Sequence, residues 1–260
     1  MSDYILARKS RNIASSMVHI LLNLLLGIGA VVVTMLTVSP LLGILLVVVS
    51  KWRIFAVRPR FIMTNLKANL VDLIVGISVV LLTYYSGSTI LPVDFLLAGF
   101  YCLWLLWLKP QNSELFTQIQ SLVAVFFGIT AATIMSAELN SVVLVVLSFL
   151  IGYAASRHIL LQTNAKDFTL TTLVGGLFFA EIALLCHSWL IIYTFGNTGI
   201  RIPQLAIILT IFAFVYNYIR QSIATAQEDF RFKDILAPII FGVVTIAIII
   251  LGFSNPIFNV

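Results

Sequence analysis

Charged side chains are scarce in this chain of 260 residues. Only 10% of its residues are Asp, Glu, Lys or Arg, 61% are hydrophobic, and the mean hydropathy is +1.10. An ordinary soluble domain is about 25% charged, and a water-soluble fold of this size would expose too much apolar surface. The scarcity of charge therefore excludes an ordinary soluble protein and indicates that lipid surrounds the chain.

Cysteine is scarce too, and no residue spacing typical of a cofactor or metal site is present. Cys102 and Cys186 lie in different apolar runs at different predicted depths, so we expect no disulfide. His19 and His187 also differ in depth, which argues against a shared haem or metal. The lysines all lie at span ends or in loops, unlike a retinal-binding lysine. We predict no cofactor, no metal and, because no basic domain stands apart, no nucleic-acid partner.

Long apolar runs divide the chain into segments of transmembrane length. A spanning helix needs about 20 mostly apolar residues, and the connections between the runs are too short to fold as a soluble domain. We therefore predict that residues 1–260 form one integral membrane domain, an all-α polytopic transmembrane helix bundle of about nine spans. The predicted spans lie near 13–38, 40–57, 68–86, 92–108, 115–136, 139–156, 168–195, 203–219 and 235–254.

The first two runs are predicted to form a hairpin. The first run is too long for a secretion signal, so we expect it to stay as a span. Basic residues flank the 13–57 region on both sides, at positions 8 to 11 and 53 to 67. Both flanks therefore favour the cytoplasm, which requires a turn at Pro40.

The positions of the basic residues predict the orientation of the whole chain. With the N-terminus inside and alternating spans, 14 of the 15 Lys and Arg residues fall on the cytoplasmic side, and only Arg201 falls outside. This is the asymmetry that the positive-inside rule describes. We predict a multi-pass protein with its N-terminus inside and its C-terminus outside, in the inner membrane if the source is prokaryotic.

Glu181 is the first candidate for chemistry, because it lies near the centre of the seventh predicted span. An ionised carboxylate in the membrane is costly, so such residues usually face the bundle interior or a polar cavity. One interpretation is a proton- or cation-coupling site. The other is a protonated side chain that hydrogen-bonds a neighbouring helix.

Three more polar residues are candidates for a polar path through the bundle. His19 and Asn23 are spaced four residues apart on one face of the first span. His187 lies in the same predicted span as Glu181 but about 120° away around the helix. For each of these residues, packing through hydrogen bonds between helices is the alternative interpretation.

The most basic stretch runs from Lys51 to Lys67, and aromatic residues interleave with its charges. Such a stretch can hold anionic lipid head groups or a phosphorylated substrate, and the alternative interpretation is orientation of the chain by positive charge alone. Asp72, near Lys67, is interpreted as an interfacial or capping residue. The candidate head-group contacts are Arg53, Arg58, Arg60 and Lys67.

These residues leave three classes of function open. A transporter or permease-like carrier for a small solute is the first hypothesis, with Glu181 as its coupling residue. A membrane-embedded assembly or scaffold subunit, with membrane protein partners, is the alternative. A membrane enzyme acting on a lipid-linked substrate is the third, although no acid–base or metal constellation supports it. Small residues, such as the Gly176–Ala180 pair, predict close helix packing in each case.

Overall fold

The computed structural model describes residues 2–54, 56–87, 91–161, 168–189, 191–196, 198–226 and 233–253. The side chains of residues 2–15, 53, 189, 224–226 and 234 lie outside this description. Helices dominate the described chain, which confirms the predicted all-α class. The elements in chain order are α1 (Ser2–Thr37), α2 (Pro40–Ser50), η1 (Trp52–Ile54), α3 (Pro59–Ala68), α4 (Leu70–Ser86), α5 (Pro92–Leu103), η2 (Trp104–Leu108), α6 (Glu114–Glu138), α7 (Ser141–Leu160), α8 (Phe168–Cys186), η3 (His187–Trp189), β1 (Ile192–Thr194), β2 (Arg201–Pro203), α9 (Gln204–Ala226) and α10 (Lys233–Gly252).

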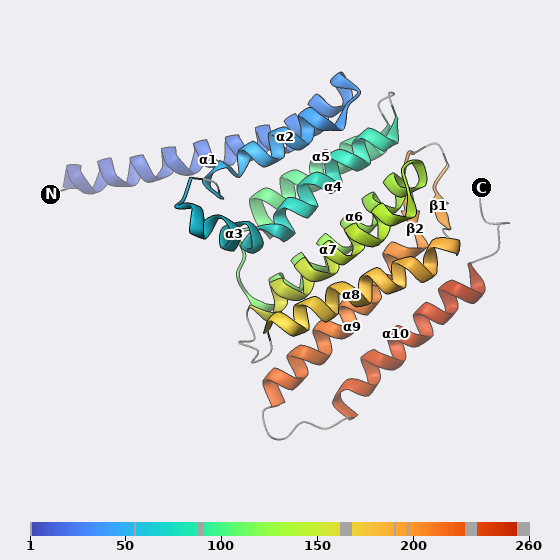
Figure 1. Cartoon of the computed structure of the whole chain (residues 1–260). Helices are drawn as coiled ribbons and strands as arrows, with labels where there is room; N and C mark the ends of the chain where they lie inside the picture. The colour runs from blue at the N-terminus through green and yellow to red at the C-terminus, as the bar shows by residue number, and fades with distance from the viewer. Residues whose placement is uncertain are drawn as a thin grey trace.

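The longer helices lie side by side, with α1 at one edge and α10 at the other, and apart from the short α3 successive helices run in opposite directions (Figure 1). One end of the bundle carries Lys51, Lys109 and Arg157, and we call it the basic end. At the opposite end, β1 and β2 form an antiparallel pair between α8 and α9, and we call it the hairpin end. Helix α6 contacts α4, α7 and α9 and is the most buried of the membrane-length helices.

Capping residues fix where several helices begin. Pro40 opens α2, and the Ser39 hydroxyl accepts a hydrogen bond from the Leu41 backbone N–H at 3.4 Å. Asn140 caps α7 in the same way. The turn before α2 is tight, because Val38 has a φ of 47°. The predicted hairpin turn at Pro40 therefore lies where the structure turns, between α1 and α2.

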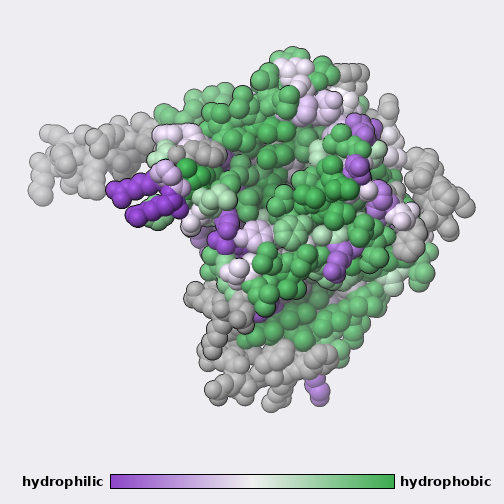
Figure 2. All heavy atoms as spheres, in the orientation of Figure 1, coloured by the Kyte–Doolittle hydropathy of each residue, from purple (hydrophilic) through white to green (hydrophobic). Residues whose placement is uncertain are grey.

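Two apolar cores stabilise the bundle. Val75, Val79 and Tyr101 belong to a core built from α1, α2, α4 and α5. Leu144 and Leu209 belong to a second core, built from α6, α7, α8 and α9. Outside these cores, large apolar side chains remain exposed along α1, α8 and α10, and they cover much of the visible face (Figure 2). Such a surface suits contact with lipid, as expected for a multi-pass membrane protein.

The structure does not confirm the number of nine spans. In the described chain, six helices are long and apolar enough to cross a membrane, or seven if α3 and α4 form one bent span. Helix α2 has 11 residues, so it is about 16 Å long at 1.5 Å per residue, well short of a hydrocarbon core about 30 Å thick. The predicted second span, 40–57, is therefore not one continuous helix.

Helix α3 is an amphipathic arm at the basic end. It meets α4 at an angle of 65° and contains no buried residue. Its exposed Arg60 and Lys67 lie seven residues apart on one face, opposite the apolar Ile62 and Leu66. This pattern is typical of a helix that lies along a membrane surface.

Candidate functional site

Glu181 lies on the outside of α8. Its side chain is exposed, and it stands five positions before Cys186, the last residue of the helix. It is therefore about 7.5 Å from the end of α8, closer to the hairpin end than the sequence indicated. Leu177 and Leu184 are exposed on the same helix face. Glu181 lines neither of the two pockets described below, so its coupling role stays a prediction.

The other predicted polar residues do not gather around Glu181. His19 and Asn23 lie on α1, where the Asn23 Nδ2 and His19 Nδ1 atoms are 3.1 Å apart in a contact on the exposed face. His187 begins η3, beyond the end of α8, and its buried Nδ1 has no hydrogen-bond partner in the described chain. The structure therefore places these residues at separate points of the bundle.

The predicted head-group contacts lie at or next to helix α3. Arg58, Arg60 and Lys67 are exposed, and the Arg60 guanidinium lies 4.5 Å from the centre of the Phe61 ring. The side chain of Arg53 lies outside the described part of the chain. The described side chains are thus exposed at the basic end, and their contact with head groups stays a prediction.

An ion cluster that the sequence did not indicate joins three helices at the basic end. The Asp72 carboxylate lies at the start of α4 and forms salt bridges with Lys51 and Lys109. Lys51 follows α2, and Lys109 follows η2. The Lys109 Nζ atom lies 2.6 Å from one carboxylate oxygen. The Trp104 indole N–H donates a hydrogen bond of 3.0 Å to the other carboxylate oxygen. The Lys51 and Asp72 side chains are 6% and 9% exposed, whereas Lys109 is 38% exposed.

The charges of this cluster do not cancel. Burial lowers the pKa of Lys51 to about 8, although the Asp72 carboxylate opposes this effect. Burial also disfavours the charged form of Lys109, but the Asp72 carboxylate outweighs it and raises the pKa of Lys109 above its ordinary value. Counted formally, two lysines and one aspartate leave a net charge of +1, and burial weakens the positive form of Lys51.

A π-helical turn, η2, sets the positions of Trp104 and Lys109, two members of this cluster. In η2 the Lys109 backbone N–H donates to the Trp104 carbonyl oxygen at 2.8 Å, five residues back. Such turns often occur at functional sites. The Gln120 side chain of α6 then closes the turn, because its amide donates to the carbonyl oxygens of Leu108 at 2.6 Å and Gln111 at 2.9 Å. His158 of α7 contacts the Gln120 amide oxygen at 2.8 Å.

The first pocket lies between α6, α7, α8 and α9, toward the basic end, and has a volume of about 300 Å³. We call it the α6–α9 pocket. Its lining includes Ser121, Phe178, Phe212, Tyr216 and Asn217. The Asn217 side chain is only 3% exposed. Neither its Nδ2 nor the Tyr216 hydroxyl has a hydrogen-bond partner among the residues that the structure describes. A buried donor without an acceptor is costly, so two residues of this lining carry polar groups that lack a partner in the described part of the chain.

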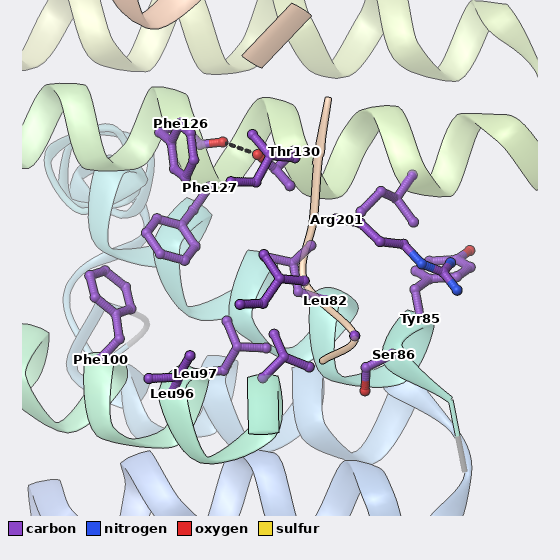
Figure 3. Close-up of a pocket in the computed structure, with 15 residues that line it drawn as sticks. Leu82, Tyr85, Ser86, Leu96, Leu97, Phe100, Phe126, Phe127, Thr130 and Arg201 are labelled. Carbon is purple, nitrogen blue, oxygen red and sulfur yellow. Dashed lines mark hydrogen bonds between the residues drawn. The ribbon is translucent and has the colours of Figure 1, made fainter. Parts of the chain in front are cut away.

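The second pocket lies toward the hairpin end, between α4, α5, α6 and β2, and has a volume of about 310 Å³. We call it the hairpin-end pocket. Leu82, Leu97, Phe100 and Phe127 line it, and Arg201 of β2 lies at one side of it (Figure 3). Phe100 and Phe127 stack with ring centres 4.2 Å apart. The pocket therefore combines an apolar wall with one cation.

Local spacing in the sequence could not reveal these features. Lys51, Asp72 and Lys109 come from separate segments, and the helix faces that line the pockets are set by packing. The one available signal was an acidic residue, Asp72, inside an apolar run. Comparison with protein-family models, with curated proteins and with solved structures finds no match. No group of three or more His, Cys, Asp or Glu residues in the described ranges could hold a metal ion.

Proposed function

We propose that the chain is a small-solute carrier and that its solute binds in the α6–α9 pocket. The observation that carries this proposal is the Asn217 amide, which is buried, belongs to a residue that lines the pocket and has no partner for its Nδ2 atom within the described chain. Natural folds pair most buried donors. An unpaired donor in a pocket is best explained by a ligand that supplies the acceptor.

The lining of this pocket favours an aromatic carboxylate. Phe178, Phe179 and Phe212 form much of the wall, and the rings of Phe178 and Phe212 meet edge to face at 5.2 Å. The carboxylate would accept from Asn217 and Tyr216. Arg157 and Arg220 follow lining residues in the chain, and each has a buried Nε without a partner among the described residues.

Replacing Asn217 with leucine tests this assignment because function and stability should respond in opposite directions. Uptake of radiolabelled phenylacetate and phenylpropionate into proteoliposomes should fall about 10- to 100-fold, because a hydrogen bond to a charged group contributes about 1.5–3 kcal/mol. The thermal unfolding temperature in detergent should stay equal or rise, because the variant removes a buried unpaired amide.

The control is Asn65→Leu, which removes an amide from α3, outside both pockets, and should leave uptake unchanged. Equal uptake by wild type and Asn217→Leu would contradict the proposal. If the wild type transports none of these solutes, the assembly-subunit alternative gains support. Its motivating observation is that Glu181 faces outward on α8 among exposed leucines, where a helix of another membrane protein could bind it.

We further propose nine passes with the basic end in the cytoplasm. The alternating helix directions and the 14 of 15 Lys and Arg residues assigned to one side support this topology. It would place α3, with Arg58, Arg60 and Lys67, against anionic lipid head groups. Tags on the two termini should be accessible from opposite sides of sealed vesicles. Accessibility of both tags from one side would contradict an odd number of passes.

A further inference from the structure

The hairpin-end pocket is apolar at one side and polar at the other. Phe100 and Phe127 lie toward one side of it, while Arg201, Tyr85 and Ser86 lie toward the other (Figure 3). The geometry points to a binding site for a single-chain anionic amphiphile, a free fatty acid, with its alkyl chain among α4, α5 and α6 and its carboxylate at Arg201. This assignment does not depend on the α6–α9 pocket or on the proposed carrier function.

The wall of the pocket suits an alkyl chain because the hydroxyl groups of Thr130 and Ser86 are already paired. The Thr130 hydroxyl donates to the Phe126 carbonyl oxygen at 2.6 Å. The Ser86 oxygen lies 2.7 Å from the Thr83 carbonyl oxygen and 2.8 Å from the Asp94 carboxylate. The remaining wall is mainly Leu, Ile, Val and Phe. An apolar chain can therefore enter without leaving the Thr130 or Ser86 hydroxyl unpaired.

Arg201 supplies the charge that the head group requires. It is exposed, and it makes no salt bridge within the described chain. It is also the only Lys or Arg residue that the sequence places toward this end of the bundle. Asp94, which follows the lining residue Val93, accepts hydrogen bonds from Ser86 and from the Leu91 backbone N–H. The Arg201 guanidinium is thus available for a carboxylate, which it can bind through two parallel hydrogen bonds.

The strand that carries Arg201 is held in place from both sides. Thr194 of β1 is its partner in the two-stranded sheet, and the Val93 backbone N–H of α5 donates to the Thr198 carbonyl oxygen at 3.2 Å. The neighbouring Gly199 has a φ of 79° and packs against Leu91 and Val93. These backbone contacts therefore fix the segment from which the Arg201 side chain extends. The volume of about 310 Å³ is at the small end of ligand pockets, which favours one chain over two.

The test uses the full-length protein in phosphatidylcholine nanodiscs and a photoactivatable alkyl chain with either a carboxylate or an alcohol head group. The carboxylate probe should label residues of α4, α5 and α6, and unlabelled decanoate should compete better than decanol. Arg201→Gln should lower carboxylate labelling about tenfold or more and leave alcohol labelling unchanged, because it removes one charged contact. Lys233→Gln, which removes an exposed cation at the start of α10, is the control and should change neither.

Two results would overturn the assignment. Equal labelling of the wild type by carboxylate and alcohol probes would show a general lipid-facing groove. Stronger labelling by a two-chain phospholipid probe than by the fatty acid would rule out a single-chain ligand. Because the comparison of head groups uses the wild type, it stays decisive even if the Arg201 variant fails to fold.

Discussion

Asp72→Asn is expected to lower the free energy of unfolding by about 3–5 kcal/mol, the usual cost of leaving a buried charge without its partner. The substitution keeps the size of the side chain and an oxygen for the Trp104 indole. It removes the negative charge that Lys51 and Lys109 share. Lys109 can turn toward water because it is partly exposed, whereas Lys51 cannot. Titration with SDS in mixed micelles measures the effect.

A second substitution separates the charge effect from a loss of packing. In the double variant Lys51→Met/Asp72→Asn, both buried charges are gone and Lys109 is free to reach water. Its stability should return close to that of the wild type, because replacing a buried ion pair by apolar groups is often neutral. If the single variant is as stable as the wild type, or the double variant is no better than the single one, the cluster does not hold these helices together.

The ion cluster could not be predicted from residues that are close together in the sequence. In the sequence, Lys67 lies five residues before Asp72, and this spacing alone suggests an interfacial or capping role for Asp72. Its partners are instead Lys51 and Lys109, which belong to other helices. Charge patterns along one segment predict neighbours only within about one helical turn. A pairing across three segments depends on how α2, α4 and α5 pack, which single-residue patterns do not encode.

The class of protein, by contrast, could be predicted, because it depends on composition. A low content of charge and long apolar runs require lipid as the solvent, and turn residues such as Pro40 and Asn140 mark helix starts. The number of spans does not follow from composition in the same way, because hydropathy does not fix helix length. The run at 40–57 is apolar enough to suggest a span, yet α2 ends at Ser50.

The direction in which Glu181 faces could not be predicted either. Helix α8 is apolar on every side, so its sequence has no face that marks the interior of the bundle. In a soluble helix, a charged residue identifies the solvent side. In a membrane helix it can face a cavity, a partner helix or the head groups, and only tertiary packing decides. The Asn217 amide was missed for the same reason.

Gly152→Ala is expected to destabilise the bundle, although alanine favours a helix more than glycine does. Helices α7 and α8 approach closely at this position. A Cβ atom on Gly152 would lie 2.7 Å from the Phe179 Cβ and 2.9 Å from the Gly175 carbonyl oxygen. Both atoms are close to the backbone of α8, so the helices must separate. The cost of such overpacking is about 1–3 kcal/mol, measured as the free energy of unfolding in the SDS titration.

The matched control is Gly99→Ala in α5, where an added Cβ would meet no atom within 4 Å. This variant should be as stable as the wild type or more stable by up to about 1 kcal/mol, the helix-propensity difference alone. If both variants gained stability equally, α7 and α8 would not pack as closely as described.

Because Gly175, on the same contact, also lines the α6–α9 pocket, a separation of α7 and α8 should additionally reduce uptake of the aromatic carboxylates. That joint loss would connect the packing of small residues, which the sequence predicted, to the pocket, which it did not.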